Sequence, residues 1–300
     1  MEKIETVSLD GTGLSTHAPP APDSIDAGTS KAAGENFPVA LRLLPARHRR
    51  HLMAVYRFAR TVDDVGDEAP PDQRLRLLGE LEADVARLYG DGSGAPPRSE
   101  AVRGLGPAVT ECAIPAQPFT DLIQANRQDQ IVTRYETYEE LLGYCRLSAN
   151  PVGRIVLHVF GSFSDERAGL SDRVCTALQL AEHWQDVSED LRAGRVYLPA
   201  EDIERFGVTE EDLARRCAPP QVRALMAFET RRARSLLDAG APLTGSLRGW
   251  ARAAVAGYVA GGRATLTAIA AADHDVLRAT PRPQKQRVAA ELALAYARGR

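Results

Sequence analysis

The chain has 300 residues, of which 44% are hydrophobic, so it can form one large domain or two small ones around a sizeable core. Its net charge of -3 excludes the strongly basic character of a nucleic-acid-binding protein, and no nucleic-acid partner is expected.

The first 33 residues are rich in Gly, Ser, Thr, Pro and Asp and lack both a hydrophobic period and the apolar core of a signal peptide. We expect residues 1–33 to be a disordered tail and residues 34–300 to form one domain. The four cysteines are far apart, as in a cytoplasmic protein with reduced thiols. The most apolar stretch, 250–272, carries two arginines and predicts a buried helix. Peripheral contact with the inner face of a membrane stays open.

Helical patterns follow along the rest of the chain. Asn36 and Pro38 are typical of a helix start, and Pro70-Pro71 ends the helix that contains residues 55–67. The segment 195–199 is extended and could fold over a site. Further helices are expected at 72–89, 99–113, 117–129, 136–163 with a break at Pro151, 170–192, 200–216 in short pieces, 219–238, 246–272 and 284–298. The sequence therefore predicts an all-α chain of about ten helices.

Two acidic pairs stand out from these helices. Asp63 and Asp67 are four residues apart and share a helix face, and Asp186 and Asp190 repeat the spacing. A single pair is weak evidence, because solvated helices carry such pairs by chance. Two facing pairs would form an oxygen-lined site for Mg2+, which prefers one or two carboxylates together with water and phosphate oxygens.

The second pair belongs to a longer polar stripe. Gln179, then Glu182 or His183, then Asp186 and Asp190 follow the helical period, so we expect one continuous helix face that is polar where a core stripe would be apolar.

Several sequence blocks, in this order, resemble the squalene/phytoene synthase family, which are head-to-head prenyl synthases of the all-helical isoprenoid synthase fold. The resemblance covers roughly residues 34–298. Its blocks are Arg60-x-x-Asp63-Asp-x-x-Asp67, Tyr144-Cys-x-x-Ser-Ala-Asn-Pro-Val-Gly153, Gln179-Leu-x-x-x-Trp-Gln-Asp186-Val-x-x-Asp190 and Gly194-Arg-Val-Tyr-Leu-Pro199. The resemblance implies a single helical domain with a central active-site cavity.

The chain departs from the usual family pattern in places. Asn36-Phe37-Pro38 replaces a Ser-Phe start, Asn150 follows Ala149 where Gly is usual, and Gln185 precedes Asp186 where Arg is usual. These variants resemble the hydroxysqualene synthase branch of bacterial hopanoid pathways. That branch implies a lyase that takes presqualene diphosphate and quenches the carbocation with water, without NADPH. A presqualene diphosphate synthase would be its functional partner. Glu182 replaces a usual Asn, and its role stays open.

The resemblance also implies roles for individual residues. Asp63, Asp67, Asp186 and Asp190 would hold several Mg2+ ions, and Arg60 and Arg195 would bind the diphosphate. Tyr144, Phe37, Trp184 and Tyr197 would offer aromatic faces to the carbocation. Asn36 and Asn150 would place the water or reshape the hydride-donor pocket, and Gln179 and Gln185 would line the substrate site.

Structural alternatives accompany several of these roles. Tyr144 and Trp184 could be core residues, Asn150 could cap the helix break, His183 could be a packed histidine, and Asp64 is expected outside the metal's direct ligands. Rival activities are presqualene diphosphate, squalene or phytoene synthesis. A non-catalytic helical partner protein is disfavoured, because all four aspartates are present.

Overall fold

The computed structural model describes residues 44–90, 92 and 94–298. The chain divides into two units, Met1–Pro38 and Val39–Arg300, and the description below concerns the second unit alone. The expected tail and the helix start at Asn36 lie outside the described residues, so the domain boundary at residue 34 stays a prediction.

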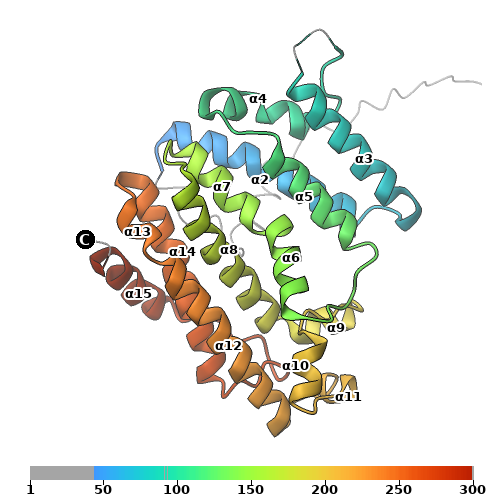
Figure 1. Ribbon diagram of the computed structural model, residues 1–300, viewed down its shortest axis with the longest axis vertical. Helices are drawn as coiled ribbons and strands as arrows, with labels where there is room; N and C mark the ends of the chain where they lie inside the picture. The colour runs from blue at the N-terminus through green and yellow to red at the C-terminus, as the bar shows by residue number, and fades with distance from the viewer. Residues whose placement is uncertain (1–43, 91, 93, 299–300) are drawn as a thin grey trace, which may run out of the picture. The chain divides into compact units, whose positions relative to one another are not determined.

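The described chain is all-helical, as the sequence predicts (Figure 1). The helices are α2 (Ala46–Asp67), α3 (Pro71–Leu88), α4 (Glu100–Cys112), α5 (Gln117–Gln128), α6 (Tyr138–Ser148), α7 (Asn150–Val159), α8 (Asp165–Gln185), α9 (Val187–Arg192), α10 (Ala200–Arg205), α11 (Glu210–Leu213), α12 (Pro220–Gly240), α13 (Leu243–Ser246), α14 (Gly249–Ala271) and α15 (Lys285–Arg298). The described residues contain no strand beyond an isolated parallel bridge between Arg134 and Val196.

Local sequence signals set most helix ends. Pro71 and Pro151 each lie in a first turn, where the missing backbone N–H costs no hydrogen bond. The break expected near Pro151 falls at Ala149, between α6 and α7. Gly194 follows α9 with a φ of 81°, a left-handed conformation that glycine adopts without strain.

The prediction of one continuous helix over residues 170–192 is wrong in two respects. The helix begins earlier, at Asp165, where the Ser164 side chain caps it. It is also interrupted at Asp186, whose φ of -104° and ψ of 16° separate α8 from α9. The amides of Asp186 and Asp190 still bond the carbonyls of Glu182 and Asp186, at 3.0 and 2.8 Å. The polar stripe therefore turns at Asp186 instead of following one straight helix.

Helix α8 is the centre of the bundle and packs against α7 and α12 (Figure 1). Its Leu180 and Trp184 are fully buried. Gly153 of α7 lets the two helices approach closely, because a Cβ there would meet Ser171 Oγ and lie 2.5 Å from Cys175 Sγ. The central position of α8 fixes where its polar C-terminal end, which carries the second acidic motif, emerges from the core.

Candidate functional site

The first acidic pair lies at the exposed C-terminal end of α2, where the end of α5 holds it. Asn126 Nδ2 donates to Asp63 Oδ1 at 3.2 Å. Gly66 makes this contact possible, because a Cβ at position 66 would collide with Asn126 Oδ1. Gln130 Nε2 adds a bond to the Gly66 carbonyl at 3.1 Å. The α2–α5 contact therefore fixes the position of Asp63.

Arg60 forms ion pairs with two other carboxylates at the end of α2. Its Nη2 is 2.7 Å from Asp64 Oδ1 and 3.4 Å from Glu68 Oε1, on the neighbouring face of α2. Asp64 thus serves as the counter-ion of Arg60, and its expected place outside the metal's direct ligands stays a prediction.

Arg195 connects the two acidic motifs. Its Nη2 is 3.2 Å from Asp67 Oδ1, and its backbone N–H donates to the Asp190 carbonyl at 2.8 Å. The extended segment that carries Arg195 is fixed by the bond from Val196 N to Thr133 O, at 2.9 Å. The chain therefore brings Asp67 and the second motif to one place, although they are far apart in sequence.

An aromatic cluster lies beside Arg195. The His183 and Tyr197 rings stack with centroids 3.6 Å apart and planes 14° apart, and Tyr144 lies 5.8 Å from Tyr197. Gln179 Nε2 is 3.1 Å from His183 Nε2, and Asp190 Oδ2 is 3.8 Å from His183 Nδ1. His183 is therefore a packed, buried histidine that touches the second motif.

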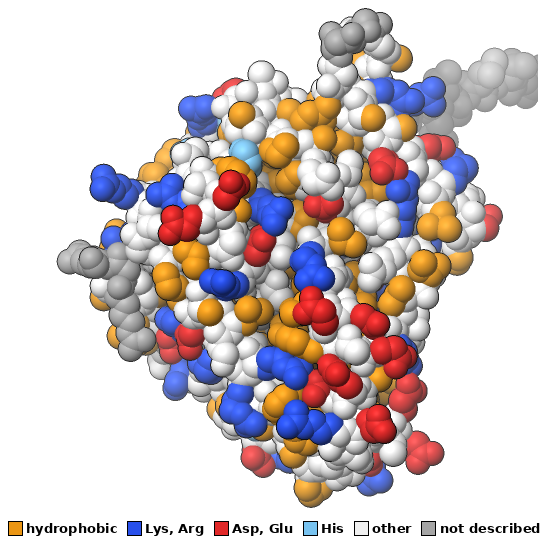
Figure 2. All heavy atoms as spheres, in the orientation of Figure 1, with side chains coloured by type: hydrophobic (Ala, Val, Ile, Leu, Met, Phe, Trp, Pro, Cys, Tyr) orange, Lys and Arg blue, Asp and Glu red, His pale blue; other side chains and the backbone are white. Residues whose placement is uncertain are grey.

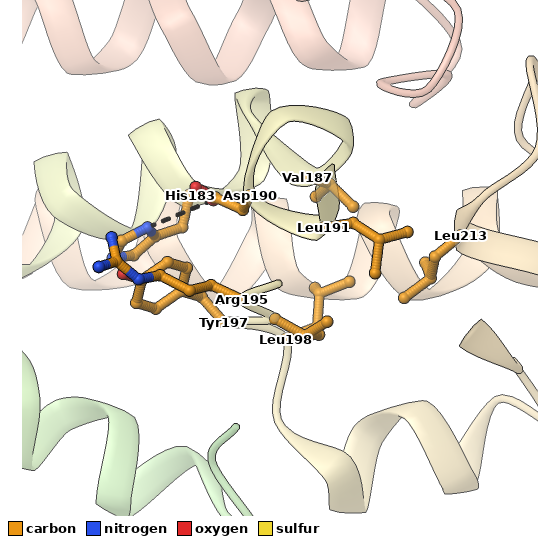
Figure 3. Close-up of a pocket in the computed structure, with 9 residues that line it drawn as sticks. His183, Val187, Asp190, Leu191, Arg195, Tyr197, Leu198 and Leu213 are labelled. Atoms are coloured by element: carbon orange, nitrogen blue, oxygen red, sulfur yellow. Dashed lines mark ion pairs between the residues drawn. The ribbon is translucent and has the colours of Figure 1, made fainter. Parts of the chain in front are cut away.

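A small pocket opens next to this cluster (Figure 3). The side chains of His183, Arg195 and Tyr197 lie together on one side of the view, and apolar side chains form the other side. The lining residues are His183, Val187, Asp190, Leu191, Arg195, Val196, Tyr197, Leu198 and Leu213. The pocket thus joins charged groups to an apolar wall.

Asp129, at the end of α5, belongs to the same cluster, and sequence reasoning assigned it no role. The Tyr144 hydroxyl donates to Asp129 Oδ2 at 2.9 Å, so Tyr144 has the bonded hydroxyl of a core tyrosine and also faces the site. Burial raises the pKa of the Asp129 carboxyl to about 6, while the Tyr144 bond and the charge of Arg195 oppose the rise. The available signal was Asn126-x-x-Asp129, which places two polar groups on one face of the helix end.

Three other candidate residues lie in structural contacts. The buried Asn150 accepts a hydrogen bond from Thr176 Oγ1 at 2.9 Å and makes no side-chain cap, so it links α7 to α8. Gln185 Nε2 donates to the Pro281 carbonyl. Trp184 is fully buried in the core. Asn36 and Phe37 lie outside the described residues.

Comparison with known proteins gives the family. The sequence model described as squalene/phytoene synthase matches residues 30–289. The chain belongs to the squalene/phytoene synthase family. A hydroxysqualene synthase of Rhodopseudomonas palustris is 39% identical over 218 residues, which are 71% of this chain and 72% of the relative. A presqualene diphosphate synthase of the same organism is 32% identical over 231 residues, covering 72% and 78%.

A solved structure supports the same family. The crystal structure of squalene synthase HpnC from Alicyclobacillus acidocaldarius is 40% identical, covers 83% of this chain and 94% of that one, and superposes with a TM-score of 0.75. The squalene/phytoene synthase fold expected from the sequence is therefore confirmed.

The donor atoms at the candidate site fit magnesium bound together with a diphosphate. Burial, and then the charges of Glu189, Asp190 and Glu182, raise the pKa of Asp186 to about 6, which a cation would reverse. Residues 44–298, apart from positions 91 and 93, contain no group of three or more His, Cys, Asp or Glu arranged to hold a metal ion. Carboxylates divided between separate helices suit Mg2+, which takes one or two of them and fills its shell with water and phosphate oxygens.

Proposed function

We propose that this protein converts presqualene diphosphate to hydroxysqualene in a Mg2+-dependent reaction that uses water and needs no NADPH. The observation that carries the proposal is the higher identity to the hydroxysqualene synthase than to the presqualene diphosphate synthase of one organism, 39% against 32%. The sequence departures at Asn36, Asn150 and Gln185 support the same branch.

The first chemical step breaks the C–O bond to the diphosphate, which leaves with the electron pair. Asp63, Asp67, Asp186 and Asp190 would hold the magnesium. When bound, Mg2+ neutralises the charge of the leaving group as a Lewis acid. Arg195 would contribute a fixed guanidinium, whose geometry matches phosphate oxygens, next to Asp67.

The carbocation then has to rearrange before water reaches it. Tyr144 and Tyr197 are buried beside Arg195, so their ring faces could stabilise positive charge in a site from which bulk water is excluded. The ring of Tyr144 is held in place by its bond to Asp129.

The last step forms a new C–O bond from water and releases a proton. We assign Asp129 as the acceptor of that proton. One of its oxygens accepts from Tyr144, and the other, Oδ1, is buried without a hydrogen-bond partner among the described residues. A carboxyl with a pKa near 6 suits a base at neutral pH.

The test is an incubation of the purified protein with Mg2+ and presqualene diphosphate, without NADPH, in water enriched in 18O. We expect hydroxysqualene that carries the label, detected by gas chromatography with mass spectrometry, and no product when EDTA removes the metal. Turnover of farnesyl diphosphate, with presqualene diphosphate left unchanged, would instead make the protein a coupling enzyme of the same family. Unlabelled product would contradict the water quench.

A further inference from the structure

Helix α15 exposes an apolar surface where a surface helix normally exposes polar residues. Between Val288 and Ala297 the only charged residue is Glu291, and it is half-buried. The helix packs on α14 and α13 at the edge of the bundle (Figure 1), and Ala295 is buried there. The exposed residues are Ala289, Ala290, Leu292, Ala293, Leu294, Tyr296 and Ala297. The solvent-facing arc of this helix therefore carries no charged side chain over about two and a half turns.

The start of α14 extends this surface. Trp250 is 45% exposed, and the neighbouring Arg252 lies over the Tyr296 ring, with Cζ 4.3 Å from its centroid. Four of the seven large hydrophobic side chains that are exposed in the described chain belong to this region: Trp250, Leu292, Leu294 and Tyr296. We call these four the α15 patch. Such a concentration marks an interaction surface, unlike apolar residues scattered singly.

The sequence around the α15 patch is basic. Residues 246–252 and 282–298 contain six Lys or Arg and one acidic residue, in a chain whose net charge is -3. Over the middle of the face shown in Figure 2, acidic and basic side chains are interspersed. The α15 patch therefore combines exposed apolar and aromatic side chains with an excess of positive charge.

We propose that the α15 patch docks on the surface of an anionic lipid bilayer. Trp and Tyr partition to the boundary between headgroups and acyl chains, and basic residues at the rim attract anionic lipids. A helix of this kind lies in the plane of the interface, and no helix in the described part of the chain is long and apolar enough to cross a bilayer. Charge favours lipid over a second copy of the chain, because a symmetric contact through this patch would oppose the two basic rims.

Trp250 supplies the readout, because the chain has two tryptophans and the other, Trp184, is fully buried. The full-length protein would be mixed with phosphatidylcholine vesicles with and without phosphatidylglycerol, some carrying brominated acyl chains that quench indole fluorescence. We expect binding to the anionic vesicles, quenching that is lost in Trp250→Phe, and release as salt screens the charges. The vesicle experiment needs no substrate, so its outcome does not depend on whether the proposed reaction is correct.

Paired variants test the surface itself. Lys285→Gln with Arg287→Gln should weaken binding to anionic vesicles about tenfold or more, and Leu292→Ser with Leu294→Ser should weaken it comparably. The matched controls are Arg216→Gln with Arg231→Gln, which remove the same charge from exposed positions elsewhere, and the exposed Leu75→Ser. Thermal unfolding of each variant confirms that it is folded.

Three results would overturn the proposal. One is the absence of binding to anionic vesicles, and another is equal binding by the patch variants and the controls. The third is a concentration-dependent dimer in sedimentation analysis that the Leu292→Ser and Leu294→Ser pair abolishes, because a second copy would then be the occupant of the patch.

Discussion

Replacing Gly66 by Ala tests how the first acidic motif is held. The new Cβ would collide with Asn126 Oδ1 and lie 3.3 Å from Asn126 Cγ. The Asn126 amide would have to rotate, which breaks its bonds to Asp63 Oδ1 and to the Leu122 carbonyl, both 3.2 Å long. Asp63 would then lose the hydrogen bond that it accepts from Asn126.

Two opposing effects set the change in folding free energy. Ala in place of a helical Gly stabilises by about 1 kcal/mol, whereas losing a hydrogen bond to a charged group costs about 1.5 kcal/mol. We expect the free energy of unfolding to change by no more than about 1 kcal/mol. Catalysis should suffer more, with kcat/KM about tenfold lower or worse, because misplaced catalytic groups are costly.

A double-mutant cycle with Asn126→Ala separates the two effects. In the Asn126→Ala background the collision is absent, so Gly66→Ala should stabilise by about 1 kcal/mol in urea unfolding and leave kcat/KM unchanged. Gly79→Ala is the matched control. A Cβ there meets only Arg127 Nη2 at an ordinary 3.6 Å, so we expect stabilisation without a kinetic effect. Wild-type kinetics for Gly66→Ala, or additivity within about 0.5 kcal/mol, would refute the reasoning.

Two further predictions concern charge. Burial raises the pKa of Glu229 from 4.5 to about 8 against the opposing charge of Arg232, so between these pH values the folded carboxyl keeps a proton that the unfolded one has lost. The free energy of unfolding therefore falls as pH rises through this window. In urea unfolding, Glu229→Gln should be more stable than wild type by about 1–3 kcal/mol at pH 8 but not at pH 4.5. Parallel pH profiles of the two proteins would contradict this. Arg195→Gln should lower kcat/KM about a hundredfold. The unfolding temperature should hardly change, because the ion-pair partner of Arg195, Asp67, is mostly exposed. Full activity would exclude a role for Arg195 in diphosphate binding.

Local spacing in the sequence predicted most of the helices, although it missed the break at Asp186, and it supplied the candidate residues of each motif. Pro70-Pro71, Pro151 and Gly194 act on their own backbone, so their effects on helix ends can be predicted without the tertiary structure. The spacing of Asp63 and Asp67 places both carboxylates on one helix face for the same reason. The sequence blocks also sufficed for the family, which the comparisons confirm.

Only the tertiary structure decided which charges meet. The sequence named Arg60 first and Arg195 second for the diphosphate. In the structure Arg60 pairs with Asp64 within its own helix, whereas Arg195 reaches Asp67 from a distant segment. The break at Asp186 and the bond between Asp129 and Tyr144 were likewise invisible in the sequence. These features depend on how α5, α6 and α8 pack, and packing follows from contacts between residues that no local period relates.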